Sequence, residues 1–256
     1  MGSLYDYMRV PMDPSSEHAQ RRYGAIKKFF DWALKEELVP RKRELRVLDL
    51  CAGTGIAGAA LCETLHEWGI KGSLTLVDKR GEDLSLVKNW LSREEEVTGI
   101  VGDCLTELPK LRDFDVALLW GHSMAHFNPF QAAKLFRSVA EVLNPGGIFL
   151  IEETDNFERL FYRGRYRSPY VEVKSDEWAL LSLDEGYSRK RGTITIGFYR
   201  IPNWELVERT ELRFWDLAGI AGMLSMAFEK VGIVSKAEHG IVGVDDVVYA
   251  LLPHRA

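Results

Sequence analysis

Residues 46–55 read RVLDLCAGTG, a short apolar run that leads into a glycine-rich segment. The run 46–50 is typical of a parallel strand that is buried on both faces. Gly53 and Gly55 follow it, and they allow the backbone to turn tightly into the helix that apolar spacing predicts over 56–68. The stretch therefore predicts a strand, a glycine turn and a helix, which is the first unit of an α/β fold.

The alternation of strand and helix continues as far as residue 155. We expect strands at 73–78, 97–101, 115–120 and 148–152, with helices at 82–91 and from Pro129 to the turn at 144–147. Parallel strands need crossover connections, and helices supply them. The pattern predicts a doubly wound, mostly parallel sheet that is covered on both faces.

After residue 155 the pattern becomes extended and aromatic. Expected strands lie at 170–174, 177–183, 193–201 and 206–215, with a turn at 184–186, and they predict an inserted antiparallel β lobe. Helical spacing returns over 216–230, and two further strands at 233–238 and 247–252 form a hairpin. We therefore expect a seven-stranded sheet that ends in an antiparallel hairpin.

Composition excludes several classes of protein. Hydrophobic residues make up 46 % of the 256 residues, which is enough for a large core. The net charge of −5 gives no chain-wide attraction for phosphate backbones, so it disfavours a general nucleic-acid coat protein. The three cysteines form no metal-binding spacing, and no apolar run approaches the roughly 20 residues of a membrane span. We expect a soluble, cytoplasmic protein with no membrane partner.

Three aspartates follow three successive strands of the predicted sheet. Asp49, Asp78 and Asp103 should meet at one edge, because the carboxyl ends of parallel strands lie together. Such carboxylates can accept hydrogen bonds from ribose hydroxyls, an amino group and an adenine amine. A ligand that carries a sulfonium and an ammonium explains them better than NAD, although Gly53, Gly55 and Gly58 also satisfy the dinucleotide fingerprint. Each acid alone could instead be a solvated loop carboxylate or a helix N-cap.

At these motifs the sequence resembles the class I S-adenosylmethionine-dependent methyltransferases, whose fold is Rossmann-like. The family's acidic glycine loop corresponds to Asp49, Gly53 and Gly55, with Cys51 in place of the first glycine. Asp78 matches the ribose-binding acid, and residues 143–147 match the turn before the fifth strand. The resemblance implies S-adenosyl-L-methionine as cofactor and S-adenosyl-L-homocysteine as product. The cofactor-binding residues that it implies are Asp49, Cys51, Ala52, Gly53, Thr54, Gly55, Asp78, Lys79, Gly102, Asp103, Cys104, Trp120 and Gly121.

The resemblance also implies a division of the chain. We expect one methyltransferase domain over 1–256, in which an N-terminal helical lid at 1–40 precedes the cofactor-binding core at 41–155. An inserted β-rich substrate lobe at 156–215 follows, and the helix and hairpin at 216–256 complete the core. Tyr5, Arg22 and Trp178 are the candidate residues for binding the substrate.

Residues 120–127 read WGHSMAHF and follow the fourth strand, where the family places groups close to the reacting methyl. Direct displacement at that methyl requires alignment and exclusion of water, and a base where the nucleophile carries a proton. His122 and His126 are the candidates for that base, and a capping or packing role is the alternative for each. Their spacing suits a metal on a helix, but no third ligand is evident, so we expect none.

The acceptor is expected to be a small molecule with a nucleophilic oxygen, nitrogen or carbon atom. The basic runs at 163–167 and 189–191 lie beside aromatic residues and keep an RNA or protein acceptor open. A non-catalytic S-adenosylmethionine-binding regulatory module is a third reading, and an NAD-linked oxidoreductase is the last. The β-rich insertion is also the candidate surface for a homodimer.

Overall fold

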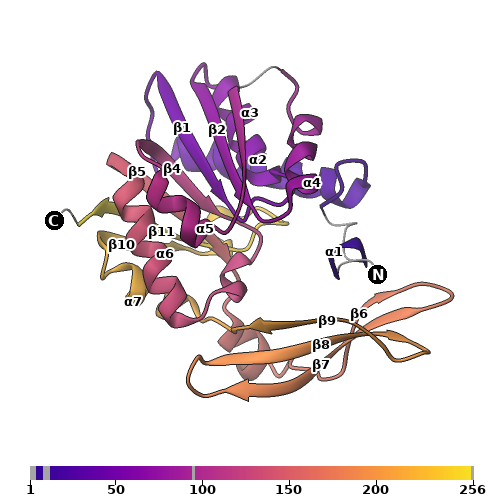
Figure 1. The fold of residues 1–256 in the computed structure, drawn as a ribbon. Coiled ribbons are helices and arrows are strands. Elements are labelled where there is room, and N and C mark those ends of the chain that lie inside the picture. The colour runs from indigo at the N-terminus through magenta and orange to yellow at the C-terminus, as the bar shows by residue number, and fades with distance from the viewer. Residues whose placement is uncertain (1–3, 8–11, 94–95, 255–256) are drawn as a thin grey trace.

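The computed structural model describes residues 4–7, 12–93 and 96–254, except for the side chains of residues 5 and 6. A seven-stranded sheet forms its centre, in the order β10-β11-β5-β4-β1-β2-β3 (Figure 1). Only β11 runs antiparallel to its neighbours, which confirms the mostly parallel sheet with an antiparallel terminal hairpin. The strands are β1 (Glu44–Leu50), β2 (Lys71–Asp78), β3 (Glu96–Val101), β4 (Phe114–Leu119), β5 (Leu143–Glu153), β10 (Phe228–Val234) and β11 (Asp246–Pro253).

Helices cover both faces of this sheet. On one face α2 (Glu17–Lys35) and α3 (Ile56–Glu67) bury their apolar sides against the strands. On the other face α6 (Pro129–Val142) and α7 (Leu217–Leu224) do the same. Short helical segments complete the core and the connections: α4 (Gly81–Leu84), η1 (Ser85–Asn89), α5 (Cys104–Glu107), η2 (Leu108–Lys110), η3 (Ser123–His126), η4 (Phe157–Tyr162) and α8 (Lys236–His239).

The predicted β lobe is a separate antiparallel sheet in the order β6-β7-β8-β9. Figure 1 shows it standing off the core, with one end beside the segment that follows β4. Its strands are β6 (Tyr170–Lys174), β7 (Ala179–Ser188), β8 (Thr193–Ile201) and β9 (Glu205–Leu212). The indole of Trp215 donates to the carbonyls of Met124 and Phe127 in 2.9 and 3.1 Å hydrogen bonds. These contacts hold the end of the lobe against η3.

The amino-terminal helix α1 (Leu4–Tyr7) packs on the lobe. Leu4 is buried against Leu180 and Phe198, and its amide donates to a carboxylate oxygen of Glu208 at 3.2 Å. The ring of Tyr7 meets that of Trp178 edge to face, with 5.4 Å between centroids. Leu4 and Tyr7 therefore belong to the lobe's small hydrophobic core.

The helix predicted over 82–91 is wrong in length and type. The structure has the single turn α4 and then the 3-10 helix η1. Leu84, Val87 and Trp90 are buried at a spacing of three residues, which matches the three residues per turn of a 3-10 helix.

Other boundaries also differ. The turn predicted at 144–147 lies inside β5, which begins at Leu143. The helix predicted over 216–230 ends at Leu224, and β10 begins at Phe228 rather than at 233, because pairing of β10 with β11 overrides local helical spacing. The turn predicted at 184–186 lies inside β7, where the register shifts between Asp184 and Gly186, so these residues form a bulge. Strand β9 ends at Leu212, before the predicted limit of 215.

Candidate active site

The glycine turn lies between β1 and α3, at the point where strand order reverses between β4 and β2. Gly53 and Gly55 have φ of 55° and 77°, in the left-handed region that glycine adopts without strain. Cys51 shares this conformation with φ of 54°, so the residue that replaces the family's first glycine still follows a left-handed turn. Ala52 and Thr54 complete the turn, and both are buried.

Asp49 lies beneath the turn and is 1 % exposed. Its Oδ2 accepts a 2.8 Å hydrogen bond from the amide of Gly58, and a Cβ added at Gly58 would lie 2.9 Å from the same oxygen. Burial raises the pKa of Asp49 to about 7, the Gly58 hydrogen bond opposes that shift, and the charge of Asp78 adds to it. The first predicted acid therefore holds the first turn of α3, directly after the glycine turn.

Asp78 ends β2 and faces the same turn. Its Oδ2 accepts a 2.7 Å hydrogen bond from the amide of Gly53. The guanidinium of Arg80 lies against the same carboxylate, with Nε 3.2 Å from Oδ1, and also forms a 2.8 Å ion pair with Asp83. Arg80 thus lies across the glycine turn, and sequence reasoning overlooked it.

Asp103 follows β3 and caps α5, since its Oδ1 accepts from the amide of Leu105 at 2.9 Å. Its other oxygen is 2.9 Å from Nζ of Lys79, and this hydrogen bond raises the pKa of the Lys79 ammonium. The neighbouring Gly102 donates its amide to the carbonyl of Asp78 at 2.9 Å. The three predicted acids therefore lie on adjacent loops at one edge of the sheet, and Asp103 also fills the capping role.

Cys51 and Cys104 complete this edge of the turn. Cys104 is buried, and the interaction with its thiol, together with burial, raises the pKa of Cys51 well above its usual range. Both cysteines are unbridged.

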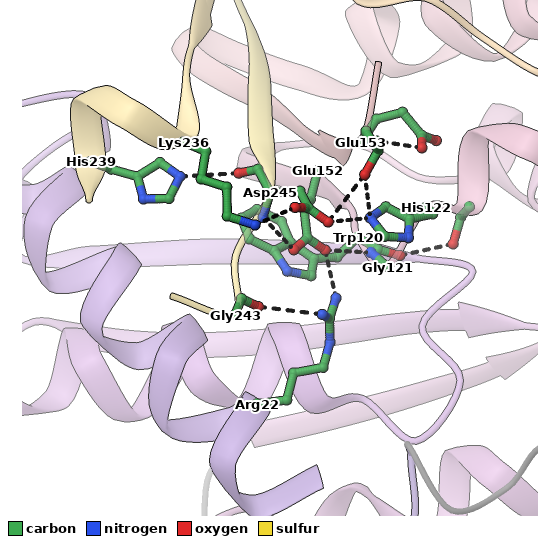
Figure 2. A network of polar contacts seen from close by, with 12 residues as sticks. Arg22, Trp120, Gly121, His122, Glu152, Glu153, Lys236, His239, Gly243 and Asp245 are labelled. Carbon is green, nitrogen blue, oxygen red and sulfur yellow. Dashed lines mark hydrogen bonds and ion pairs between the residues drawn. The ribbon is translucent and has the colours of Figure 1, made fainter. Parts of the chain in front are cut away.

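The end of β4 joins the turn to a second group of polar residues (Figure 2). Trp120 packs against Phe29 and Phe30 of α2, with ring centroids 5.4 and 5.2 Å apart. The amide of Gly121 donates to Oε2 of Glu152 at 3.0 Å, and Arg22 forms a 2.7 Å ion pair with the same oxygen. Arg22, predicted as a substrate residue, thus reaches the carboxyl edge from α2.

His122 follows at once and lies in the left-handed region with φ of 60°. Its Nε2 is 2.9 Å from Oδ2 of Asp245, which also accepts from the hydroxyl of Thr154 at 3.1 Å. Lys236 contributes its ammonium to the other oxygen of Asp245 at 2.8 Å. Figure 2 shows His122 and Lys236 on either side of Asp245.

The charges around His122 decide its protonation. Desolvation lowers the pKa of His122, but the hydrogen bond with Asp245 and the charges of Glu153 and Glu152 outweigh it, so the pKa is raised. Burial opposes the shift at Asp245, yet hydrogen bonds from His122 and Lys236 hold the pKa of its carboxyl well below the usual range. His122 and Asp245 therefore form an oriented imidazole–carboxylate pair.

His126 lies apart from this pair. Desolvation and the positive charges of Arg80 and Lys79 lower its pKa, while Asp78 and Glu208 oppose that change. Its neighbours place it between the Asp78 loop and β9. The structure therefore separates the two predicted histidines, His122 beside Asp245 and His126 beside the predicted ribose acid.

The remaining substrate candidates do not join either histidine. Trp178 packs on Tyr7 within the lobe, and the side chain of Tyr5 lies outside the described residues. Sequence reasoning missed Glu152, Glu153 and Asp245. A clue was present in the two successive acids at the end of the fifth strand, whereas nothing in the local sequence marked Asp245.

Two kinds of feature are absent from residues 4–7, 12–93 and 96–254. That part of the chain holds no cluster of three or more metal-ligating side chains. It also contains no helix with the length and apolarity that crossing a membrane requires.

Comparison with known proteins supports the resemblance to methyltransferases that the sequence motifs indicate. Residues 47–147 match the family model described as a methyltransferase domain. These residues are similar to a methyltransferase domain. This match and the fold confirm the resemblance to the class I S-adenosylmethionine-dependent methyltransferases. No curated protein sequence matches the chain.

Solved structures share the fold of this chain over nearly its whole length. The PH0226 protein from Pyrococcus horikoshii OT3 aligns with a TM-score of 0.63 at 21 % identity, covering 99 % of this chain and 100 % of that one. An S-adenosylmethionine-dependent methyltransferase from Clostridium acetobutylicum ATCC 824 gives 0.60 at 18 %, covering 97 % and 96 %. CalS10, a SAM-bound amino pentose methyltransferase from Micromonospora echinaspora, gives 0.55 at 15 %, covering 91 % and 94 %.

Proposed function

We propose that this chain transfers a methyl group from S-adenosyl-L-methionine to a small-molecule acceptor, and that His122 receives the acceptor's proton. The observation that carries the proposal is the 2.9 Å contact between His122 and Asp245 beside the glycine turn. A carboxylate that accepts a hydrogen bond from Nε2–H orients the ring and leaves Nδ1 as the nitrogen that can accept a proton. Geometry and pKa together favour His122 over His126 as the base.

The residues of the turn fit the cofactor. Asp78 is the acceptor for the ribose hydroxyls. The pKa of Asp49 is about 7, and the cationic amino-acid end of the cofactor would favour its ionised form. The guanidinium of Arg80 contacts the carboxylate of Asp78 in the structure. We expect it to release at least one carboxylate oxygen when ribose binds. When bound, S-adenosylmethionine supplies an electrophilic methyl group on a sulfonium. Trp120 and Gly121 follow β4, which pairs with β1, and we expect them to border the cofactor on that side.

Ion pairs within the basic runs at 163–167 and 189–191 favour a small acceptor over RNA. In the first run Arg163 forms an ion pair with Glu158, and in the second Arg191 forms one with Glu211. These pairs reduce the positive charge that is available to a phosphate backbone. The lobe, which the Trp215 hydrogen bonds hold beside η3, is the element that would enclose the acceptor.

The first test is calorimetric titration with S-adenosylhomocysteine. We expect micromolar binding that Asp78→Asn weakens by about tenfold or more, because charge-assisted hydrogen bonds to the ribose are lost. Glu82→Gln removes the same charge from an exposed position four residues away and should leave binding unchanged. Equal affinities for wild type and Asp78→Asn would contradict this cofactor site.

The second test is transfer of labelled methyl to pools of small molecules, RNA and protein. We expect label in the small-molecule pool, and we expect His122→Asn to reduce its rate by about 100-fold or more. His18→Asn, on an exposed position of α2, is the matched control. Label in RNA or protein alone would overturn the acceptor class. Cofactor binding with no transfer to any pool would favour a regulatory module.

A further inference from the structure

Three carboxylates gather at the carboxyl edge of the sheet, where β5 ends and β11 begins. They are Glu152, Glu153 and Asp245, which we call the acidic cluster (Figure 2). Strand pairing brings them together, since Glu153 aligns with Asp246 and Glu152 with Val247. The charges of all three act on His122, the base proposed above.

Two members of the acidic cluster have cationic partners. Glu152 forms a 2.7 Å ion pair with Arg22 and accepts the amide of Gly121 at 3.0 Å. Asp245 contacts His122 at 2.9 Å and Lys236 at 2.8 Å. Both carboxylates are therefore neutralised from within the chain.

Glu153 has no such partner. Its Oε1 accepts the amide of Thr154 at 2.9 Å, whereas its Oε2 has no hydrogen-bond partner within the described part of the chain. The residue is only 1 % exposed. An unpaired carboxylate oxygen in such a place is costly, because it gives up water and receives nothing in return.

The groups that face Glu153 come from several segments. Burial raises the pKa of Glu153 to about 7, and the charge of Glu152 adds to that rise. His122, the Thr154 amide and Arg159 of η4 lower it. Neither His122 nor Arg159 makes an ion-pair contact with it in the described structure, so their charges stabilise the carboxylate only from a distance.

The acidic cluster reaches solvent at His122. The side chain of His122 is 38 % exposed and that of Asp245 is 29 % exposed. Thr154 follows Glu153 directly, and its hydroxyl contacts Asp245 at 3.1 Å. Glu153 lies close enough to His122 for its charge to help raise the pKa of that imidazole.

We propose that Glu153 binds a protonated amine of the methyl acceptor, so that the acceptors of this enzyme are primary or secondary amines. The inference rests on the proposed function, because it places the acceptor beside His122. An ammonium supplies both the N–H donor that Oε2 lacks and the positive charge that the buried carboxylate requires. An anionic acceptor would instead meet the negative charges of Glu153 and Glu152.

The proton balance is simple. Before nitrogen can act as a nucleophile, one N–H proton moves to Nδ1 of His122, so the amine changes from +1 to neutral and the imidazole from neutral to +1. Asp245 on Nε2 stabilises the imidazolium that forms. Glu153 takes no part in this proton transfer, which makes it a specificity residue and leaves His122 as the base.

The test uses a panel of primary amines, each with its hydroxyl and carboxylate counterpart on the same carbon skeleton, such as benzylamine, benzyl alcohol and benzoate. Binding is measured by calorimetry on the full chain saturated with S-adenosylhomocysteine. We expect amines to bind about 10- to 100-fold more tightly than their hydroxyl counterparts, and carboxylates to bind least. Glu153→Gln keeps the size and the Thr154 hydrogen bond and should abolish the preference. Glu229→Gln on exposed β10 removes one charge elsewhere and should retain it.

Each outcome bears on the proposal. Equal binding of amines and alcohols by the wild type, an unchanged preference in Glu153→Gln, or no amine bound while S-adenosylhomocysteine still binds would each overturn it. The wild-type comparison keeps the proposal testable if Glu153→Gln does not fold. Loss of S-adenosylhomocysteine binding by folded wild-type protein would count against the proposed function instead, so the two failures are distinguishable.

Discussion

Nε2 of His122 and Oδ2 of Asp245 lie 2.9 Å apart, although 123 residues separate them along the chain. His122 comes from the loop after β4, and Asp245 directly precedes β11. Lys236 and Thr154 hold Asp245 from other sides, so the carboxylate has little freedom to turn away. The contact therefore fixes the orientation of the imidazole at the edge where the glycine turn lies.

Asp245→Asn should lower the pKa of His122, because the variant removes the charge and the hydrogen bond that raise it. The pKa can be followed by NMR titration of the ring, with no acceptor required. Asp113→Asn, at the opposite end of the strands, is the control. An unchanged His122 titration in Asp245→Asn would show that the pair does not form in solution. Methyl transfer should also fall by about 100-fold, as for loss of an oriented general base.

Asp49→Asn should stabilise the protein at alkaline pH. The folded-state pKa of Asp49 is raised from 3.8 to about 7, so the folded protein binds more protons than the unfolded chain between these values. Its contribution to stability is therefore lost as pH rises from about 4 to 7, and the loss is complete above 7. The variant avoids up to about 4 kcal/mol of this cost. Urea denaturation at pH 5 and pH 8 measures the difference, and equal shifts at both pH values would contradict it.

Gly58→Ala should destabilise the fold, because the added Cβ would lie 2.6 Å from Leu74 and 2.9 Å from Asp49. We expect a loss of about 1–3 kcal/mol in the free energy of unfolding, as in other overpacked cores. Gly24→Ala is the matched control, since it also lies in a helix and its Cβ meets nothing within 4 Å. That control should gain about 0.5–1 kcal/mol from helix propensity. A neutral Gly58→Ala would show that α3 is not packed closely on β1.

RNA should bind weakly, if at all, and with little dependence on salt. Arg163 and Arg191 are paired with acids, and the net charge is −5. Filter binding of single-stranded RNA between 50 and 200 mM salt checks this, since each phosphate contact would add about 0.7 to the slope of log affinity against log salt. A slope of several units would revive an RNA acceptor.

The residues that sequence reasoning located best are those whose roles are local. The run 46–55 predicted the strand, the turn and the helix, because burial on both faces and left-handed glycines leave their pattern in adjacent residues. The same logic fails at 82–91 and 216–230. At 82–91, burial of every third residue favours a 3-10 helix over an α-helix. At 216–230, pairing of β10 with β11 ends the helix early. Neither effect can be judged from the local sequence, because both depend on how the segment packs in the fold.

By itself, the sequence determined the order of strands and helices, the β-rich insertion and the acids at one sheet edge, because periodicity and strand ends are properties of neighbouring residues. Only the tertiary structure decided which polar groups find partners. Asp245 meets His122, Arg22 meets Glu152, and Oε2 of Glu153 meets none among the described residues. These outcomes depend on contacts between distant segments, such as the packing of α2 near β5 and the antiparallel pairing of β11 with β5, which joins segments about a hundred residues apart.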